Sequence, residues 1–376
     1  MGIGAALLVA GLAFVVVKKM GDNRHKKQQQ QQMLQYGAPA GYGGGGAYRP
    51  PPPSGGMGGM MGGMMGGFGG GGGSGGGGFS SGSRDINAST GQPWNATPGP
   101  DYNTVLQSLI ATINERRIGG FFPQGVESIA QRVVQTGAVQ RVATEWRIPQ
   151  DLAIDLVKLA LFDIVVLCDD SASMRNGDRI SDLQQVLAKV AFAGTLLDDD
   201  GIEIRFVNNY MQGNRINSQD AAVDIVDNIN FDGAKPLGTA IEQKILQPMV
   251  LAPARQNALR KPLLVIVITD GQPTGEPFGY LQQSIVNAAN QLNSTPYGPK
   301  AVSYQFAQVG TDMSATQFLA ALDNDPMVGA MIDCTSDYDI ESQEMLQKTG
   351  QQLTPIMWLM KLMLGGIDSS YDSQDG

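Results

Sequence analysis

The chain has 376 residues with a net charge of −9, and its 50 glycines are distributed very unevenly. The first 100 residues carry +5 (seven lysines and arginines against two aspartates) and the remaining 276 carry −14, which argues against nucleic acid or an anionic membrane surface as partner of the globular part. The only histidine, His25, lies in the polar N-terminal region, so Ser-His and Cys-His hydrolases and histidine zinc sites are disfavoured. Two cysteines, Cys168 and Cys334, are too few for a disulfide framework and fit a reducing compartment.

At its N-terminus the chain carries an apolar run, Ile3–Val17, that contains no charge and is followed directly by Lys18 and Lys19. A helix over residues 1–17 would be about 25 Å long, slightly under the usual membrane span but tolerable in a thin bilayer. A signal peptide would carry its positive charge before the apolar run rather than after it. Residues 1–19 are therefore predicted to be a single-pass membrane anchor, and the positive-inside rule places the rest of the chain in the cytosol.

Residues 20–100 have a low-complexity composition of glutamine, proline, methionine and above all glycine. Such a composition buries too little apolar surface to offset chain entropy, so a disordered linker is predicted. Its glycines are not a phosphate-binding loop, because no Gly-Lys-Ser/Thr sequence follows them.

From residue 101 onward the apolar pattern predicts folded structure. Residues 101–160 repeat apolar side chains at helical spacing, which indicates a helical extension. Strand and helix patterns then alternate over 161–366, and this predicts an α/β domain with a Rossmann-like, doubly wound, mostly parallel sheet. The expected strands are 163–168, 202–207, 263–269, 302–309 and 328–334. An amphipathic helix at 342–364 and a polar tail at 367–376 are expected to close the chain.

The strand predicted at 163–168 ends in a run of oxygen-bearing side chains. Asp169, Ser171 and Ser173 occupy alternate positions (D-x-S-x-S), a spacing that lets one carboxylate and two hydroxyls converge on a hard cation. Open α/β sheets bind ligands at the carboxyl ends of their strands, so this loop is a candidate site. Taken alone, each serine is better interpreted as a cap of the turn that follows it.

A second candidate loop, Thr269-Asp270-Gly271-Gln272-Pro273, follows the strand predicted at 263–269. The carboxylate of Asp270 could reach the first loop if the two strands are neighbours in the sheet. Alone it could instead accept backbone N–H bonds, but two such motifs in this order, each after an apolar strand, favour a shared site. By contrast, the acidic run Asp198–Asp200 is interpreted as the solvated end of a helix.

Together the two loops resemble the metal-ion-dependent adhesion site of von Willebrand factor A (VWA) domains. The resemblance covers roughly residues 160–366. It implies that Asp169, Ser171 and Ser173 hold Mg²⁺ directly, and that Asp270 holds it directly or through water.

In this family an acidic side chain of a partner protein completes the coordination of the metal. The implied function is therefore protein binding, as in adhesion or complex assembly, and not an enzyme activity. The lead-in Leu152–Phe162 and the ending Trp358–Tyr371 further resemble fungal intracellular members of the superfamily.

One position departs from the family pattern. Members usually place a threonine ligand in a Gly-x-Thr-Pro-Leu-Gly loop, whereas this chain has Lys235 in the threonine's place, within Gly233-Ala234-Lys235-Pro236-Leu237-Gly238. An ammonium directed into the site would repel a cation and could itself neutralise Asp169 and Asp270. Alternatively, Lys235 extends into solvent, water fills its position and the metal remains.

Two further functions stay open from the sequence. Carboxylates around Mg²⁺ could serve a metal-assisted hydrolase, although the missing base and the missing phosphate loop oppose it. The chain could also be a metal-independent scaffold in which Lys235 replaces the ion and the low-complexity region drives assembly.

Overall fold

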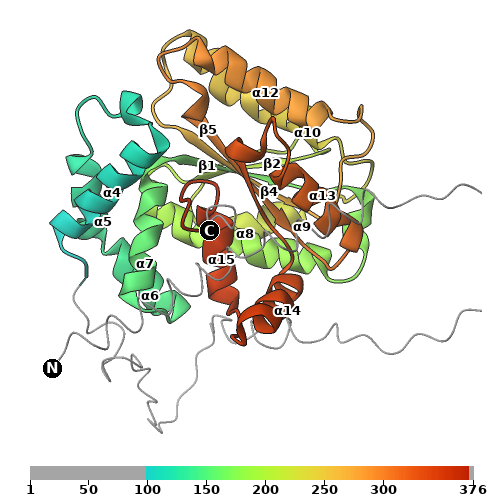
Figure 1. The fold of residues 1–376 in the computed structure, drawn as a ribbon, viewed down its shortest axis with the longest axis horizontal. Helices are drawn as coiled ribbons and strands as arrows, with labels where there is room; N and C mark the ends of the chain where they lie inside the picture. The colour runs from blue at the N-terminus through green and yellow to red at the C-terminus, as the bar shows by residue number, and fades with distance from the viewer. Residues whose placement is uncertain (1–98, 372–376) are drawn as a thin grey trace, which may run out of the picture. The chain divides into compact units, whose positions relative to one another are not determined.

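The structure, a computed structural model, describes residues 99–371 (Figure 1). The predicted membrane anchor, almost all of the predicted linker and the last residues of the polar tail lie outside the described residues. None of the helices within residues 99–371 combines the length and the apolar character that a membrane span requires.

The described part is built around a six-stranded sheet with the order β3-β2-β1-β4-β5-β6. Neighbouring strands are parallel except β3, which pairs antiparallel with β2. The strands are β1 (Asp163–Cys168), β2 (Ile202–Phe206), β3 (Gly213–Ile216), β4 (Leu263–Thr269), β5 (Val302–Gln308) and β6 (Ile332–Thr335).

Helices cover both faces of this sheet (Figure 1). On one side lie α10 (Leu237–Ala240) and α12 (Tyr280–Asn293), and on the other lie α8 (Arg179–Leu197) and α15 (Pro355–Leu364). The other helical elements after β1 are η5 (Ala172–Arg175), α9 (Gln219–Asp227), η6 (Ile241–Leu251), α11 (Ala252–Arg255), η7 (Pro299–Ala301), α13 (Met313–Asp323), η8 (Gly329–Met331) and α14 (Tyr338–Thr349). The strand order and the two helical layers are those of a Rossmann-like α/β fold, which confirms the predicted architecture.

The two strands that carry the candidate motifs are the central pair of the sheet. Both consist almost entirely of buried, largely β-branched or leucine side chains, as expected for parallel strands covered on both faces. β1 and β4 pair in parallel with Cys168 opposite Ile268, so the two motifs start at the same edge of the sheet. The expectation that the motif strands are neighbours is therefore confirmed.

Between residue 99 and β1 the structure describes six helical elements: α4 (Tyr102–Arg116), η3 (Gly119–Phe121), α5 (Glu127–Thr136), α6 (Ala138–Trp146), α7 (Gln150–Ala153) and η4 (Ile154–Leu161). Their buried apolar side chains belong to the same hydrophobic core as the sheet. The chain end packs against them: Tyr371 donates to Asp155 (2.8 Å) and Ser369 donates to Glu115 (2.6 Å). The first residues of the predicted polar tail are thus part of the folded structure.

Some predicted elements were wrong in detail. The single closing helix predicted at 342–364 is two helices, because α14 ends at Gly350 in the left-handed conformation (φ 70°) and α15 begins only at Pro355. β6 is shorter than the strand predicted at 328–334, since η8 occupies its first half. The edge strand β3 was not predicted at all.

Candidate functional site

The four predicted site residues come together where β1 and β4 end. The hydroxyls of Ser171 and Ser173 lie 3.1 Å apart, and Ser173 donates a hydrogen bond to Asp270 Oδ1 (2.9 Å). Thr269, the last residue of β4, donates to Asp169 Oδ2 (2.7 Å) and so joins the second loop to the first. The predicted convergence of the two motifs is what the structure shows.

The first loop turns sharply over the end of β1. The backbone N–H of Ser171 donates to Asp169 Oδ1 (2.9 Å), an aspartate turn that reverses the chain within two residues. The short helix η5 follows at once and holds Met174 in the core. Asp169 and Asp270 are both buried by this arrangement, so each carboxylate needs a cation or a full set of donors.

Lys235 is placed inside this site. Its backbone pairs in both directions with Thr274 (3.2 and 2.9 Å), which fixes the loop before α10 against the loop after β4. Its Nζ lies 3.1 Å from Asp169 Oδ2 and forms an ion pair with Asp270 Oδ1. The residue is only 5% exposed, so the alternative in which Lys235 extends into solvent is not the arrangement found.

A second cation, Arg179, was not predicted. It begins α8, and its Nη1 pairs with Asp270 Oδ2 and donates to the carbonyl of Ser173 (3.1 Å). Its Nη2 lies 3.9 Å from Asp312. The signal available in the sequence was an arginine six residues after Ser173, at the expected start of a helix, but its partner Asp270 is 91 residues away.

These contacts use every carboxylate oxygen of the predicted metal site. Asp169 accepts from Ser171 N–H, Thr269 and Lys235, and Asp270 accepts from Ser173, Lys235 and Arg179. A magnesium ion about 2 Å from these oxygens would lie within a few ångströms of the lysine ammonium. A divalent and a unit positive charge 4 Å apart repel by roughly 8 kcal/mol at an effective dielectric constant of about 20. With Lys235 in this position, the donor set does not fit Mg²⁺.

The adjacent carboxylate, Asp170, faces away from this cation site. It is buried and accepts the backbone N–H groups of Asn208 (2.7 Å) and Asn209 (2.8 Å), which lie just beyond β2. Burial raises the pKa of Asp170, and these two hydrogen bonds oppose that rise. Asp170 therefore fixes the loop after β2 rather than contributing to the site.

Lys244 holds the same loop from the other side. Its ammonium donates to the carbonyls of Phe206 (2.7 Å), Val207 (2.9 Å) and Asn209 (2.8 Å). It also lies 5.0 Å from the centre of the Tyr210 ring, a cation–π distance. Although its loop is fixed at so many points, Tyr210 is 88% exposed.

Large exposed apolar side chains occur in two of the loops at the carboxyl edge of the sheet. Tyr210 and Met211 follow β2, and Phe278, which is fully exposed, follows β4. We call these three residues the rim. Exposed apolar side chains are ordinary one at a time, but three in two loops at the same edge of the sheet favour an interaction surface there.

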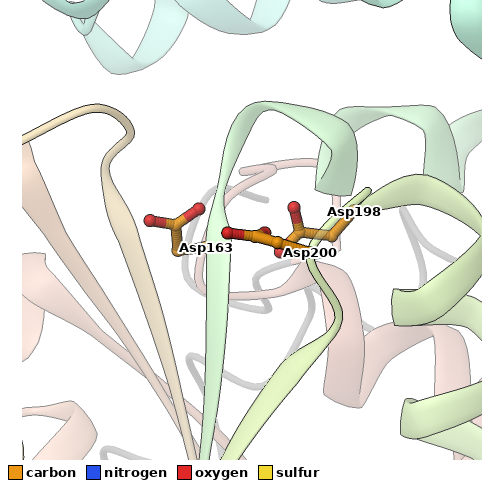
Figure 2. A group of neighbouring side chains, drawn as sticks. All are labelled: Asp163, Asp198 and Asp200. Carbon is orange, nitrogen blue, oxygen red and sulfur yellow. The ribbon is translucent and has the colours of Figure 1, made fainter. Parts of the chain in front are cut away.

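A separate acidic cluster lies at the opposite end of β1, where Asp163, Asp198 and Asp200 approach one another (Figure 2). One carboxylate oxygen from each lies within 4.8 Å of the others. Lys261 pairs with Asp198 and lies 3.5 Å from Asp163. Asp198 is only 1% exposed, so its interpretation as part of a solvated helix end was wrong. Burial raises its pKa to about 7, against the opposing effect of Lys261.

Comparison with known proteins adds no assignment, because neither protein-family models nor curated proteins match this chain.

Proposed function

We propose that the chain is a protein-interaction module that binds its partner through the carboxyl edge of the sheet. The observation that carries this proposal is the rim: three large apolar side chains that remain exposed although their loops are anchored around a strand-end site. Aromatic side chains often dominate the affinity of an interface, and anchoring the backbone of their loops lowers the entropy lost on binding.

Hydrogen bonds link the loops that carry the rim to the segment that carries Lys235. The side-chain amide of Asn208, beside Tyr210, donates to the carbonyls of Asp232 (3.1 Å) and Ala234 (2.8 Å). The next residue, Lys235, pairs with Thr274 in the loop that leads to Phe278. A partner that contacts both Tyr210 and Phe278 would therefore bind two loops that are each hydrogen-bonded to the segment carrying Lys235.

The loop after β4 has a further anchor at Glu276, two residues before Phe278. Glu276 accepts from the backbone N–H groups of Gly238 (2.9 Å) and Thr239 (2.8 Å) and from the hydroxyl of Thr239 (2.9 Å). These bonds satisfy N–H groups in the first turn of α10, as a helix cap does. Thr239 is thus engaged with Glu276 and does not replace the family's threonine ligand.

The metal-assisted hydrolase is supported less well. It needs an open cation position beside the carboxylates, and Lys235 fills that position. The membrane anchor remains a prediction from the sequence; it would hold the interaction module at the cytosolic face of a membrane.

The proposal can be tested by proximity labelling in cells with the full chain and with the double variant Tyr210→Ser/Phe278→Ser. The matched control is Met327→Ser, an exposed methionine that precedes β6 at the other edge of the sheet. We expect specific partners that the control retains and the rim variant loses, followed by a loss of roughly ten-fold or more in affinity with the purified partner.

Partners retained equally by both variants would contradict the proposal. A chain lacking residues 20–100 separates it from the scaffold alternative, since rim-mediated binding survives that deletion and assembly by the low-complexity region does not.

A further inference from the structure

We infer that Lys235 and Arg179 are the resident cations of this site, in place of a divalent metal ion. This inference concerns the site itself. Its consequence, that partner binding is independent of divalent cations, rests on the proposed function.

The charges of the site balance without an added ion. Asp169 and Asp270 contribute two buried negative charges, and Lys235 and Arg179 contribute two positive charges within ion-pair distance of them. This is the charge that one Mg²⁺ ion would supply. Arg179 engages the oxygen of Asp270 that Lys235 does not, so the two cations divide the carboxylates between them.

The lysine ammonium takes the place of a coordinated metal ion and is not a surface ion pair. It bridges the ends of β1 and β4 by contacting one carboxylate from each loop, as the metal would in the family that the motifs resemble. Ser173 and Thr269 donate to the same two carboxylates, so their hydroxyls serve as donors to carboxylates and not as metal ligands.

Backbone hydrogen bonds fix the loop that places the Lys235 ammonium in the site. Its N–H and carbonyl are both bonded to Thr274, and the carbonyl also accepts from Leu237 N–H (2.9 Å). Gly233, two residues earlier, has a φ of 87°, which lets the chain turn into the site where most side chains would be strained. A chelator removes a bound metal ion but has no effect on a cation tethered in this way.

The first experiment is calorimetric titration of Mg²⁺ and Mn²⁺ into the full chain and into Lys235→Thr, which removes the ammonium and restores the hydroxyl of the family pattern. We expect no Asp270-dependent binding in the wild type and measurable binding in Lys235→Thr, roughly ten-fold or more tighter than the weakest affinity that the titration detects. The double variant Lys235→Thr/Asp270→Ala should lose this metal binding. Lys235→Met, which supplies no hydroxyl, should bind the metal more weakly than Lys235→Thr. An Asp200→Asn background excludes ion binding by the cluster at the other end of β1.

A second measurement needs no variant of the site and so does not depend on whether Lys235→Thr folds. The wild-type chain is labelled with an amine reagent in Mg²⁺ and in EDTA, and modification of Lys235 is followed by mass spectrometry. We expect low labelling that is the same in both. Labelling of Lys235 that rises in Mg²⁺ would overturn the inference. In the titration, so would metal binding by the wild type that disappears in Asp270→Ala.

The partner assay keeps the two proposals separate. Binding through the rim that is unchanged in EDTA supports both. Partner binding that EDTA abolishes would support the interaction module but contradict the inference that Lys235 and Arg179 replace the metal ion. The absence of any rim-dependent partner would contradict the proposed function, and the metal titration would then test the site by itself.

Discussion

At the scale of single residues, the site is defined by how two buried carboxylates are neutralised. Asp169 and Asp270 are held by Lys235, from the loop before α10, and Asp270 also by Arg179, the first residue of α8; neither cation is optional once the carboxylates are out of water. The consequence is that Lys235 stabilises the folded state, whatever its part in binding.

Replacing Lys235 by methionine is expected to lower the free energy of unfolding by about 3–5 kcal/mol, the usual cost of leaving a buried charge without its partner. Urea denaturation measures this. The control is Lys348→Met, whose pair with Glu344 lies near the surface (2.9 Å) and for which a change of about 0–1 kcal/mol is expected. Equal effects of the two substitutions would show that Lys235 does not neutralise the site.

Asp198 gives a prediction about pH, because burial raises its pKa from 3.8 to about 7 in the folded chain. Between these values the folded state binds more protons than the unfolded state, so the free energy of unfolding falls as pH rises from about 4 to about 7. We expect Asp198→Asn to remove this contribution, and the stability of the variant relative to the wild type therefore increases over that range. Urea denaturation at pH 5 and pH 8 is the test, and a difference between the two chains that is independent of pH would contradict it.

The sequence predicted the four oxygen-bearing residues of the site, but it did not decide whether a metal ion or the chain's own cations neutralise the carboxylates. The D-x-S-x-S and T-D-G-x-P motifs are local patterns, so their convergence followed once their strands were expected to be neighbours. Whether Lys235 points inward depends on how its loop pairs with Thr274, a contact across 39 residues that no local pattern encodes. The pairing of Arg179 with Asp270 has the same non-local character.

At the scale of elements, the loops at the carboxyl edge are fixed by buried polar groups rather than by apolar packing. Asp170 illustrates this, since both of its oxygens accept backbone N–H groups from the loop after β2. That loop carries Tyr210 and Met211, so the position of this part of the rim depends on a buried carboxylate.

Asp170→Ala is expected to leave the sheet folded and to loosen this loop. The two N–H groups lose their acceptors, which should cost about 1–3 kcal/mol in stability and raise hydrogen exchange at Asn208 and Asn209 by roughly ten-fold or more. Exchange measured by NMR or mass spectrometry tests this, with the exposed Asp232→Ala as control. Unchanged protection at both amides would show that the loop is held without Asp170.

The elements that the sequence predicted best are those with one dominant signal. β1 and β4 were predicted with their observed bounds, because uninterrupted apolar runs ending in polar residues have few other interpretations. β3 was missed because Gly213–Ile216 is a short polar edge strand without alternation. The division between α14 and α15 was signalled by Gly350 and Pro355, but the apolar periodicity on both sides outweighed these two residues.

At the scale of the whole described domain, both ends of β1 carry a group of carboxylates that encloses a lysine. Lys235 lies at the carboxyl end with Asp169 and Asp270, and Lys261 lies at the amino end with Asp163 and Asp198. The carboxylates at each end of β1 therefore pair with a lysine of the chain itself, although the part after residue 100 is acidic in total.

It follows that the stability of the wild-type chain should not depend on divalent cations. We expect the thermal unfolding midpoint of the full chain to agree within about 1 °C in EDTA and in Mg²⁺.

In Lys235→Thr the same comparison should show a difference, because an ion present at about 100 times its dissociation constant adds about 2.7 kcal/mol to the stability of the folded state. For a domain of this size that corresponds to a rise of roughly 5–10 °C in Mg²⁺. Lys235→Met, which lacks both ammonium and hydroxyl, should show a smaller rise. A midpoint of the wild type that falls in EDTA, and does so equally in Asp200→Asn, would mean that the carboxyl edge holds a metal ion after all and that Lys235 leaves the site when the ion binds.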